Sequence, residues 1–295
     1  MPLWIAKEQG IFHKYNLEPQ LVYIIAGRAM QSMLAGDIQF GLLGATHVTN
    51  AVTAGGDMVM LLGMEDRLNY FLNARPGIKN PEGLKGKKIG IGTPSGSLAL
   101  ATYTGLDYLG LIPRRDGITL LNTGSTPERM SALFSGGIDA AFFNPEVEQI
   151  VVHQGFPVLF DLGKANVAFQ SSGLATSRKY MHANPQLVES LVKAVVEGVA
   201  FVQNPANKKI VLGSIARNLK LEGSERLERA YKTISESFPT KPCPSLPGIA
   251  SVLKLMTRHG INPRAGDIKP EDLVDMSLCK KLDDSGFFER LHQPG

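Results

Sequence analysis

Met33-Leu34-Ala35-Gly36-Asp37-Ile38 and Leu133-Phe134-Ser135-Gly136-Gly137-Ile138 follow one pattern at an offset of 100 residues. The same offset joins four of the eight glycines in the first 75 residues to a second glycine, namely Gly10, Gly36, Gly55 and Gly63. Glycine at matched positions indicates matched chain reversals, because it accepts the left-handed backbone found at helix ends and in tight turns. The sequence therefore contains an internal repeat.

Each copy of the repeat alternates helical and strand-like periods. We expect helices at 2–9, 28–35, 46–54, 97–109, 127–135 and 146–154. Short apolar runs predict strands at 19–25, 38–43, 57–62, 118–122, 138–143 and 157–161. Strands that alternate with helices form parallel sheets with helices on their faces. We therefore predict an α/β fold of two lobes, each a mostly parallel sheet flanked by helices.

The second copy begins with a strand that the first copy lacks. Lys87 to Gly92 has the pattern of a strand, and the turn Thr93 to Gly96 follows it. The counterparts of these residues would fall before Met1. We therefore expect the first lobe to lack its N-terminal strand, and a signal sequence would lie further upstream.

After residue 163 the repeat ends and the chain changes character. Val167 to Ala175 has the pattern of a strand, and helices are expected at 185–203, 206–218, 224–237, 247–259 and 283–291. This helical tail is too apolar to stand alone, so we expect it to pack on the first lobe. The predicted lobes are residues 1–74 with 172–295, and residues 75–171.

The composition of the 295 residues excludes several classes of protein. A hydrophobic content of 43 % supports a packed core and excludes disorder, collagen and coiled coil. The net charge of +4 comes from scattered basic pairs without interleaved aromatic residues, so no nucleic-acid partner is expected. No apolar run approaches the ~18–20 residues that span a bilayer. Cys243 and Cys279 fit no CxxC motif, and one disulfide in an oxidising compartment is left open.

Two such lobes would place the carboxyl ends of their strands opposite one another, where open parallel sheets bind ligands. The turn Thr93-Pro94-Ser95-Gly96-Ser97 offers hydroxyls and backbone N–H groups at a helix start. Such a turn can hold a carboxylate, sulfonate or phosphate, and it can equally serve only as an N-cap. The sequence therefore predicts a ligand site between the lobes.

The segment Pro2-Leu3-Trp4-Ile5-Ala6-Lys7-Glu8-Gln9-Gly10-Ile11-Phe12 resembles the opening helix of the taurine, sulfonate and nitrate type of ABC-transporter solute-binding proteins, which carry an NMT1-like domain. Leu84 to Gly90, Ser135 to Ala140 and the helix after Asn184-Pro185 are similar to further marks of that family. The resemblance implies the type II periplasmic-binding-protein fold, capture of a small-molecule solute between the lobes by hinge closure, a membrane ABC permease as partner, and a periplasmic location. We expect a monomer without a cofactor.

Carried over by position, the family's ligand-facing places fall on both lobes. They are Gly27, Arg28, Thr46 and His47 in the first lobe, and Ser95, Gly96, Ser97, Asn144 and Glu146 in the second. The repeat supports this set, because Thr46 and Glu146 are offset by 100 and occupy matched loops. The family usually has Glu-Pro where this chain has Asn144-Pro145, which leaves the role of Asn144 open.

Two of these residues have ordinary interpretations as well. His47 could brace its own loop as readily as donate to a ligand, and Arg28 could pair with a neighbouring acid as readily as with an anion in the cleft. A guanidinium at a helix start is locally unfavourable without an anionic partner. No histidine belongs to an HxxxH pair or lies close in sequence to a second metal ligand, so no metal site is expected.

His47 also occupies the place where the fungal thiamin-pyrimidine synthase of the same superfamily keeps the histidine that it consumes. That enzyme anchors pyridoxal phosphate on a lysine where this chain has Leu43, and without an amine no Schiff base forms. We therefore expect a non-catalytic component of an ABC import system that binds a sulfonate, carboxylate, nitrate or pyrimidine-like solute. A synthase-like enzyme and a ligand-sensing regulatory domain are the alternatives.

Overall fold

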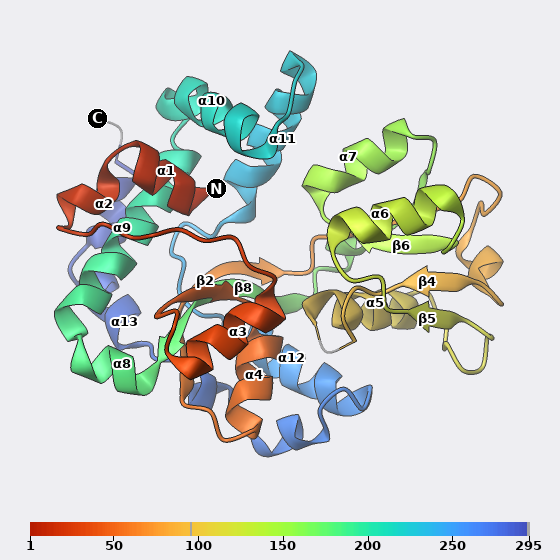
Figure 1. Ribbon diagram of the computed structural model, residues 1–295, viewed down its shortest axis with the longest axis horizontal. Helices are drawn as coiled ribbons and strands as arrows, with labels where there is room; N and C mark the ends of the chain where they lie inside the picture. The colour runs from red at the N-terminus through yellow and green to blue at the C-terminus, as the bar shows by residue number, and fades with distance from the viewer. Residues whose placement is uncertain (95, 294–295) are drawn as a thin grey trace.

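The computed structural model of the protein describes residues 1–94 and 96–293, and it shows two lobes side by side that are joined by crossing strands (Figure 1). The first lobe is built on a three-stranded sheet, in the order β1 (Gly41–Leu43), β8 (Ala168–Ser177) and β2 (Met58–Arg67). The second is built on a five-stranded sheet, in the order β5 (Thr119–Leu121), β4 (Lys88–Gly90), β6 (Ala140–Phe143), β3 (Phe71–Ala74) and β7 (Val158–Asp161). The predicted two-lobed α/β fold is confirmed.

The internal repeat is present in the structure. The first lobe carries α1 (Pro2–Glu8), α2 (Ile11–Lys14), α3 (Ala26–Ala35) and α4 (Ala45–Thr53), and the second carries α5 (Ser97–Tyr108), α6 (Thr126–Ser135) and α7 (Pro145–His153). The succession β1-α4-β2 in the first lobe corresponds to β6-α7-β7 in the second. Helices α3 and α6 both end at a left-handed glycine, Gly36 with φ 89° and Gly136 with φ 81°. The pairs at 10/110, 36/136 and 55/155 all have positive φ and make matched reversals. The fourth pair does not, since Gly63 lies within β2.

The sheets are mixed rather than mostly parallel. Strand β4 is parallel to both β5 and β6, as the repeat predicts. Strand β3 runs antiparallel to β6 and β7, and β8 runs antiparallel to β1 and β2. These two strands carry the chain from one lobe to the other. Each of them runs antiparallel to both of its neighbours in the sheet. No local pattern in the sequence shows whether a strand runs parallel or antiparallel to its neighbours.

The predicted strand at 19–25 is wrong, since these residues form no strand. Its counterpart in the second lobe, β5, pairs with β4, and no strand of the described residues takes the equivalent place beside β1. Without a partner in the ladder the segment stays irregular, and Val22, Tyr23 and Ile25 are exposed to 63 %, 92 % and 49 %.

The sheets also show where the chain passes between lobes. Strand β3 already belongs to the sheet of the second lobe, and β8 pairs with β2 from Ala168 onward. The lobe boundaries at 74/75 and 171/172 stay a prediction. We propose from sheet membership that each crossing begins several residues earlier.

Residues 58–64 of strand β2 are buried on both faces, which explains why this part of the strand carries no polar side chain. Met58 and Met60 pack in the cluster that contains residues of α4 and of α12 (Leu246–Arg258). Val59 and Leu61 point the other way, into a cluster with residues of α9 (Pro185–Gln203). Alternate side chains of a strand face opposite sides, so one apolar run supplies two cores.

The C-terminal tail packs chiefly on the first lobe, as predicted. It comprises α8 (Arg178–Ala183), α9, α10 (Lys208–Leu219), α11 (Ser224–Ser237), α12, α13 (Ser277–Asp284) and α14 (Phe287–Leu291). Gly198 of α9 lies so close to α1 that a Cβ atom there would be 2.8 Å from the Pro2 carbonyl oxygen. Helices α11 and α12 also touch the second lobe, at α7 and α5. The single helix predicted at 283–291 is interrupted by Gly286, whose φ is 67°.

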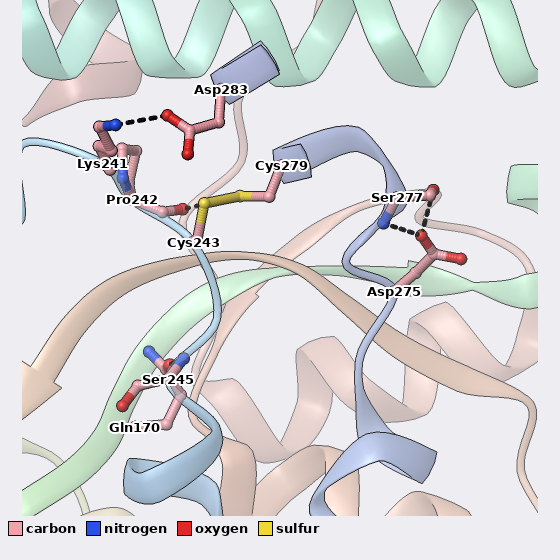
Figure 2. Close-up of a disulfide and its surroundings, with 9 residues drawn as sticks. All are labelled: Gln170, Lys241, Pro242, Cys243, Ser245, Asp275, Ser277, Cys279 and Asp283. Atoms are coloured by element: carbon pink, nitrogen blue, oxygen red, sulfur yellow. Dashed lines mark hydrogen bonds and ion pairs between the residues drawn. A yellow bond between two sulfur atoms is a disulfide. The ribbon is translucent and has the colours of Figure 1, made fainter. Parts of the chain in front are cut away.

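A disulfide joins Cys243, in the segment before α12, to Cys279 of α13, and so ties two parts of the tail together (Figure 2). Beside it, the amide of Gly63 on β2 donates to the Pro242 carbonyl at 3.0 Å. The buried Gln170 side chain on β8 accepts from the amide of Ser245 at 2.7 Å. The sequence left open whether the two cysteines are paired, and the structure shows that they form a disulfide.

Candidate functional site

The starts of α4 and α5 meet at the boundary between the lobes. The hydroxyls of Thr46 on α4 and Ser97 on α5 are hydrogen-bonded at 3.1 Å, and Thr46 has no exposed surface. These residues follow strands of different sheets, so this hydrogen bond links the two lobes directly. Neither helix has a side-chain N-cap. The first turns of both helices therefore direct backbone N–H groups toward this boundary.

Glycine is required where the two helix starts approach. Gly44 is the N-cap of α4, and a Cβ atom there would collide with the hydroxyl of Ser97 and lie 2.6 Å from the backbone oxygen of Ser171 on β8. Gly96 is the N-cap of α5 and is buried. A Cβ atom on Gly96 would crowd Thr93 of its own turn, so only the missing side chain of Gly44 makes room for the other lobe.

His47 stands beside this contact. Its Nδ1 lies 3.3 Å from the Thr46 hydroxyl, and burial lowers the pKa of the imidazole. A neutral imidazole has one N–H donor and one acceptor nitrogen. Thr46, His47 and Ser97 therefore form a small group of uncharged donors and acceptors that draws on both lobes.

Acidification should destabilise the protein through two histidines. Burial lowers the pKa of His47 and of His259, although Asp107, 3.2 Å from His259 Nε2, acts in the opposite direction. In the unfolded chain a histidine binds a proton near pH ~6.5. The two histidines therefore contribute their full share of the free energy of unfolding above pH ~6.5. That contribution is lost as the pH falls from there toward their lower pKa in the folded protein.

We expect the melting temperature to fall from pH 7 to pH ~5.5 for this reason. The double variant His47→Gln/His259→Gln should lose less stability over the same interval. Thermal unfolding of both proteins across a pH series measures the difference. Equal slopes would show that neither histidine resists protonation in the folded protein.

The other predicted site residues lie at the starts of other helices or outside the described residues. Gly27 and Arg28 lie in the first turn of α3 and are exposed. Asn144 is exposed at the N-cap of α7. Glu146 is in the first turn of that helix, and its side chain is not among those that the structure describes. Ser95 lies outside the described residues. The structure thus brings together Thr46, His47, Gly96 and Ser97, and the ligand contacts of all nine residues stay a prediction.

A cavity of about 590 Å³ lies beside the crossing strands. This volume falls in the range of small-molecule sites, ~300–1,000 Å³. Asn144, Tyr70 and Ser171 contribute to its wall, together with the end of α11. Its charged lining residues are Glu65, Asp66, Arg67, Asp161, Lys164 and Glu236. Acidic side chains outnumber basic ones, so the cavity itself does not favour an anion.

The sequence did not single out Arg129 of α6, which is 5 % exposed. It follows Glu128 in a charged pair, the usual pattern of a solvated helix face, and the repeat matches it with Ala29. Only the packing of the second lobe shows that this cation is buried.

Solved structures define the class of this fold. The alkanesulfonate-binding protein SsuA from Xanthomonas axonopodis pv. citri, bound to MOPS, has a TM-score of 0.76 at 17 % identity over 93 % of this chain and 94 % of its own. The periplasmic nitrate-binding protein NrtA from Synechocystis PCC 6803 has a TM-score of 0.75 at 15 % identity over 96 % and 85 %. The desulfurization enzyme DSZB has a TM-score of 0.65 at 15 % identity over 96 % of both chains. The fold is that of the periplasmic binding proteins.

The sequence itself fixes the family. A family model described as NMT1/THI5 like matches residues 1–208, about 70 % of the chain. The chain therefore belongs to the NMT1/THI5-like family. No curated protein matches it. Within the described residues, no helix is both long and apolar enough to cross a bilayer.

Proposed function

We propose that the protein is the solute-binding component of an ABC import system, and that it closes its two lobes over a small anionic or heteroaromatic solute. The observation that carries this proposal is the hydrogen bond between Thr46 and Ser97, which joins the predicted ligand-facing residues of both lobes. The similarity to a sulfonate-binding and a nitrate-binding protein supports a solute of this kind.

We propose a periplasmic location and a membrane permease as the partner. Disulfides persist in oxidising compartments such as the periplasm, and Cys243 is joined to Cys279. The nitrate-binding relative is described as periplasmic. Both observations support this location.

We propose further that the protein is not an enzyme. The synthase alternative needs a lysine at position 43, and Leu43 is buried in the core of the first lobe, 2 % exposed. The similarity to DSZB is a likeness of fold and assigns no reaction to this chain. Incubation with pyridoxal phosphate should give no imine absorbance, and an imine band would favour the enzyme.

A thermal-shift screen tests the proposed function. Ethanesulfonate, acetate, nitrate and 4-aminopyrimidine represent the four solute classes. A compound at a hundredfold excess over its Kd should stabilise the folded protein by about 2.7 kcal/mol. If none of these classes raises the melting temperature, the solute-binding proposal fails.

Thr46→Val should weaken binding of the solute found by that screen by about tenfold, since a lost hydrogen bond costs ~0.5–1.5 kcal/mol and the hydroxyl of Ser97 is left without its partner. Titration calorimetry measures the change. Thr49→Val is the matched control on the same helix, because the Thr49 hydroxyl donates to the Ala45 carbonyl of its own turn. Equal affinities for the two variants would place Thr46 outside the site.

A further inference from the structure

Arg129 is a buried cation. Within the part of the chain that the structure describes, its side chain makes one hydrogen bond, from Nη2 to the Thr126 hydroxyl at 3.1 Å, and Nε has no hydrogen-bond partner. Among the side chains that the structure describes, no carboxylate lies within ion-pair distance of it. Arginine is rarely buried unless it is paired, because removing a charge from water is costly.

The neighbouring carboxylate is already occupied. Glu128 accepts from the Ser125 amide at 2.6 Å and from the Ser125 hydroxyl at 2.7 Å, which closes the first turn of α6. The guanidinium also makes a weak contact with an aromatic ring. Its carbon lies 5.0 Å from the centre of the Phe143 ring. Burial lowers the pKa of Arg129 to about 10, so the group keeps its charge at neutral pH.

Arg129 lies at the edge of the sheet where ligands bind. A Cβ atom on Gly92 would be 3.7 Å from Nη1, 3.2 Å from Leu98 of α5 and 3.5 Å from the Gly124 carbonyl. Gly92, Gly124 and Phe143 follow or end strands β4, β5 and β6, which run parallel. The carboxyl ends of parallel strands share one edge, which is the ligand edge of open α/β sheets.

The guanidinium lies close to the contact between the lobes. The Cβ position of Gly92 is 3.7 Å from Nη1 and 3.2 Å from Leu98, which follows Ser97 in the first turn of α5. A planar guanidinium with a free Nε suits a carboxylate, sulfonate or nitrate group, each of which offers two or more oxygens.

We propose that Arg129 binds the oxyanion group of the solute and so makes the site selective for small oxyanions over neutral heteroaromatic compounds. This inference rests on the proposed function. It deepens that function by choosing between the two solute classes.

Titration calorimetry with sodium ethanesulfonate, acetate and nitrate tests the assignment on wild type, Arg129→Met and Arg129→Lys. At least one anion should bind wild type, and Arg129→Met should lose more than tenfold in affinity for it. Arg129→Lys should fall between them, because lysine keeps the charge but loses the planar fork. An affinity of Arg129→Met equal to that of wild type would overturn the assignment.

The melting temperature in an anion-poor buffer separates recognition from a structural role. Replacing an unpaired buried charge by an apolar side chain of similar length should leave stability nearly unchanged. A large loss of stability in Arg129→Met would show that the guanidinium serves the fold. That result would overturn the assignment if Arg129→Lys is destabilised as well. If Arg129→Lys folds normally and shows the intermediate affinity, the assignment is supported.

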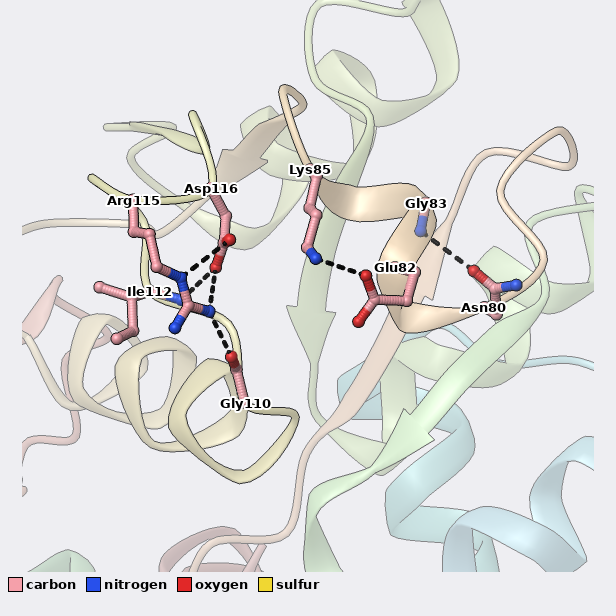
Figure 3. Close-up of polar contacts among 8 residues, drawn as sticks. All are labelled: Asn80, Glu82, Gly83, Lys85, Gly110, Ile112, Arg115 and Asp116. Atoms are coloured by element: carbon pink, nitrogen blue, oxygen red, sulfur yellow. Dashed lines mark hydrogen bonds and ion pairs between the residues drawn. The ribbon is translucent and has the colours of Figure 1, made fainter.

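Arg115→Met is the matched control in the same lobe. Arg115 is exposed, and its guanidinium donates to both carboxylate oxygens of Asp116 and to the Gly110 carbonyl (Figure 3). This variant should bind anions as wild type does. If 4-aminopyrimidine binds and no anion does, this inference fails while the proposed function stands. If no compound binds, the proposed function fails as well.

Discussion

Gly44→Ala is expected to displace the start of α4 and to weaken solute binding by up to about 100-fold. The new methyl group would collide with the Ser97 hydroxyl of the second lobe and lie 2.6 Å from the backbone oxygen of Ser171 on β8, in the sheet of its own lobe. The Ser97 side chain can rotate away but the strand backbone cannot, so the strain falls on the turn that holds Thr46 against Ser97. Overpacking of this kind costs ~1–3 kcal/mol, and each 1.4 kcal/mol is about tenfold in affinity. Calorimetry with the solute that stabilises wild type most measures the loss.

Gly77→Ala is the matched control for this experiment. Gly77 has no atom within 4 Å of the position that a Cβ would take, so its substitution should change neither affinity nor stability. Gly44→Ala that binds as tightly as wild type would mean that the bound protein does not bring α4 and α5 into contact. The closure that we propose would then be wrong.

Removing the disulfide should produce the largest loss of stability. Cys243 and Cys279 are 36 residues apart, and a closed loop of that length stabilises the folded state by about 4 kcal/mol in the chain-entropy treatment. Cys243→Ser/Cys279→Ser should therefore melt about 10 °C below wild type. The bond holds the segment before α12 to α13, so the tail should loosen from β2 first.

Dithiothreitol supplies the control within the same measurement. The reductant should lower the melting temperature of wild type toward that of the double variant, and it should leave the double variant unchanged. A wild type that mass spectrometry shows to be fully reduced, yet that melts at its original temperature, would contradict this account of how the tail is held.

Local signals in the sequence predicted most helices of this fold. The helices expected at 185–203 and 224–237 match α9 and α11 to the residue, because Asn184-Pro185 and Gly223-Ser224 mark their starts chemically. The direction of β3 and β8 could not be predicted, since it depends on how the chain crosses between lobes. The strand expected at 19–25 failed because a strand forms only with a hydrogen-bonded neighbour, and apolar sequence alone does not supply one.

The candidate site was predictable where the repeat and the helix starts pointed to it. Thr46 stood out through the family resemblance and the repeat, Ser97 through its turn at a helix start, and the structure joins them. Arg129 carries no such signal, because its burial comes from Phe143, Thr126 and the loop at Gly92, which lie apart in the sequence. A charged residue on a helix is ordinarily solvated, so its burial had to be observed.

The distance between the lobes tests the central claim most directly. Spin labels on Arg114→Cys in the second lobe and Lys209→Cys in the tail of the first would both stand on exposed positions. With the solute that stabilises the protein most in the thermal-shift screen, electron–electron resonance should show one narrow distribution at a shorter distance than without it. An unchanged distribution at saturating solute would contradict closure of the two lobes.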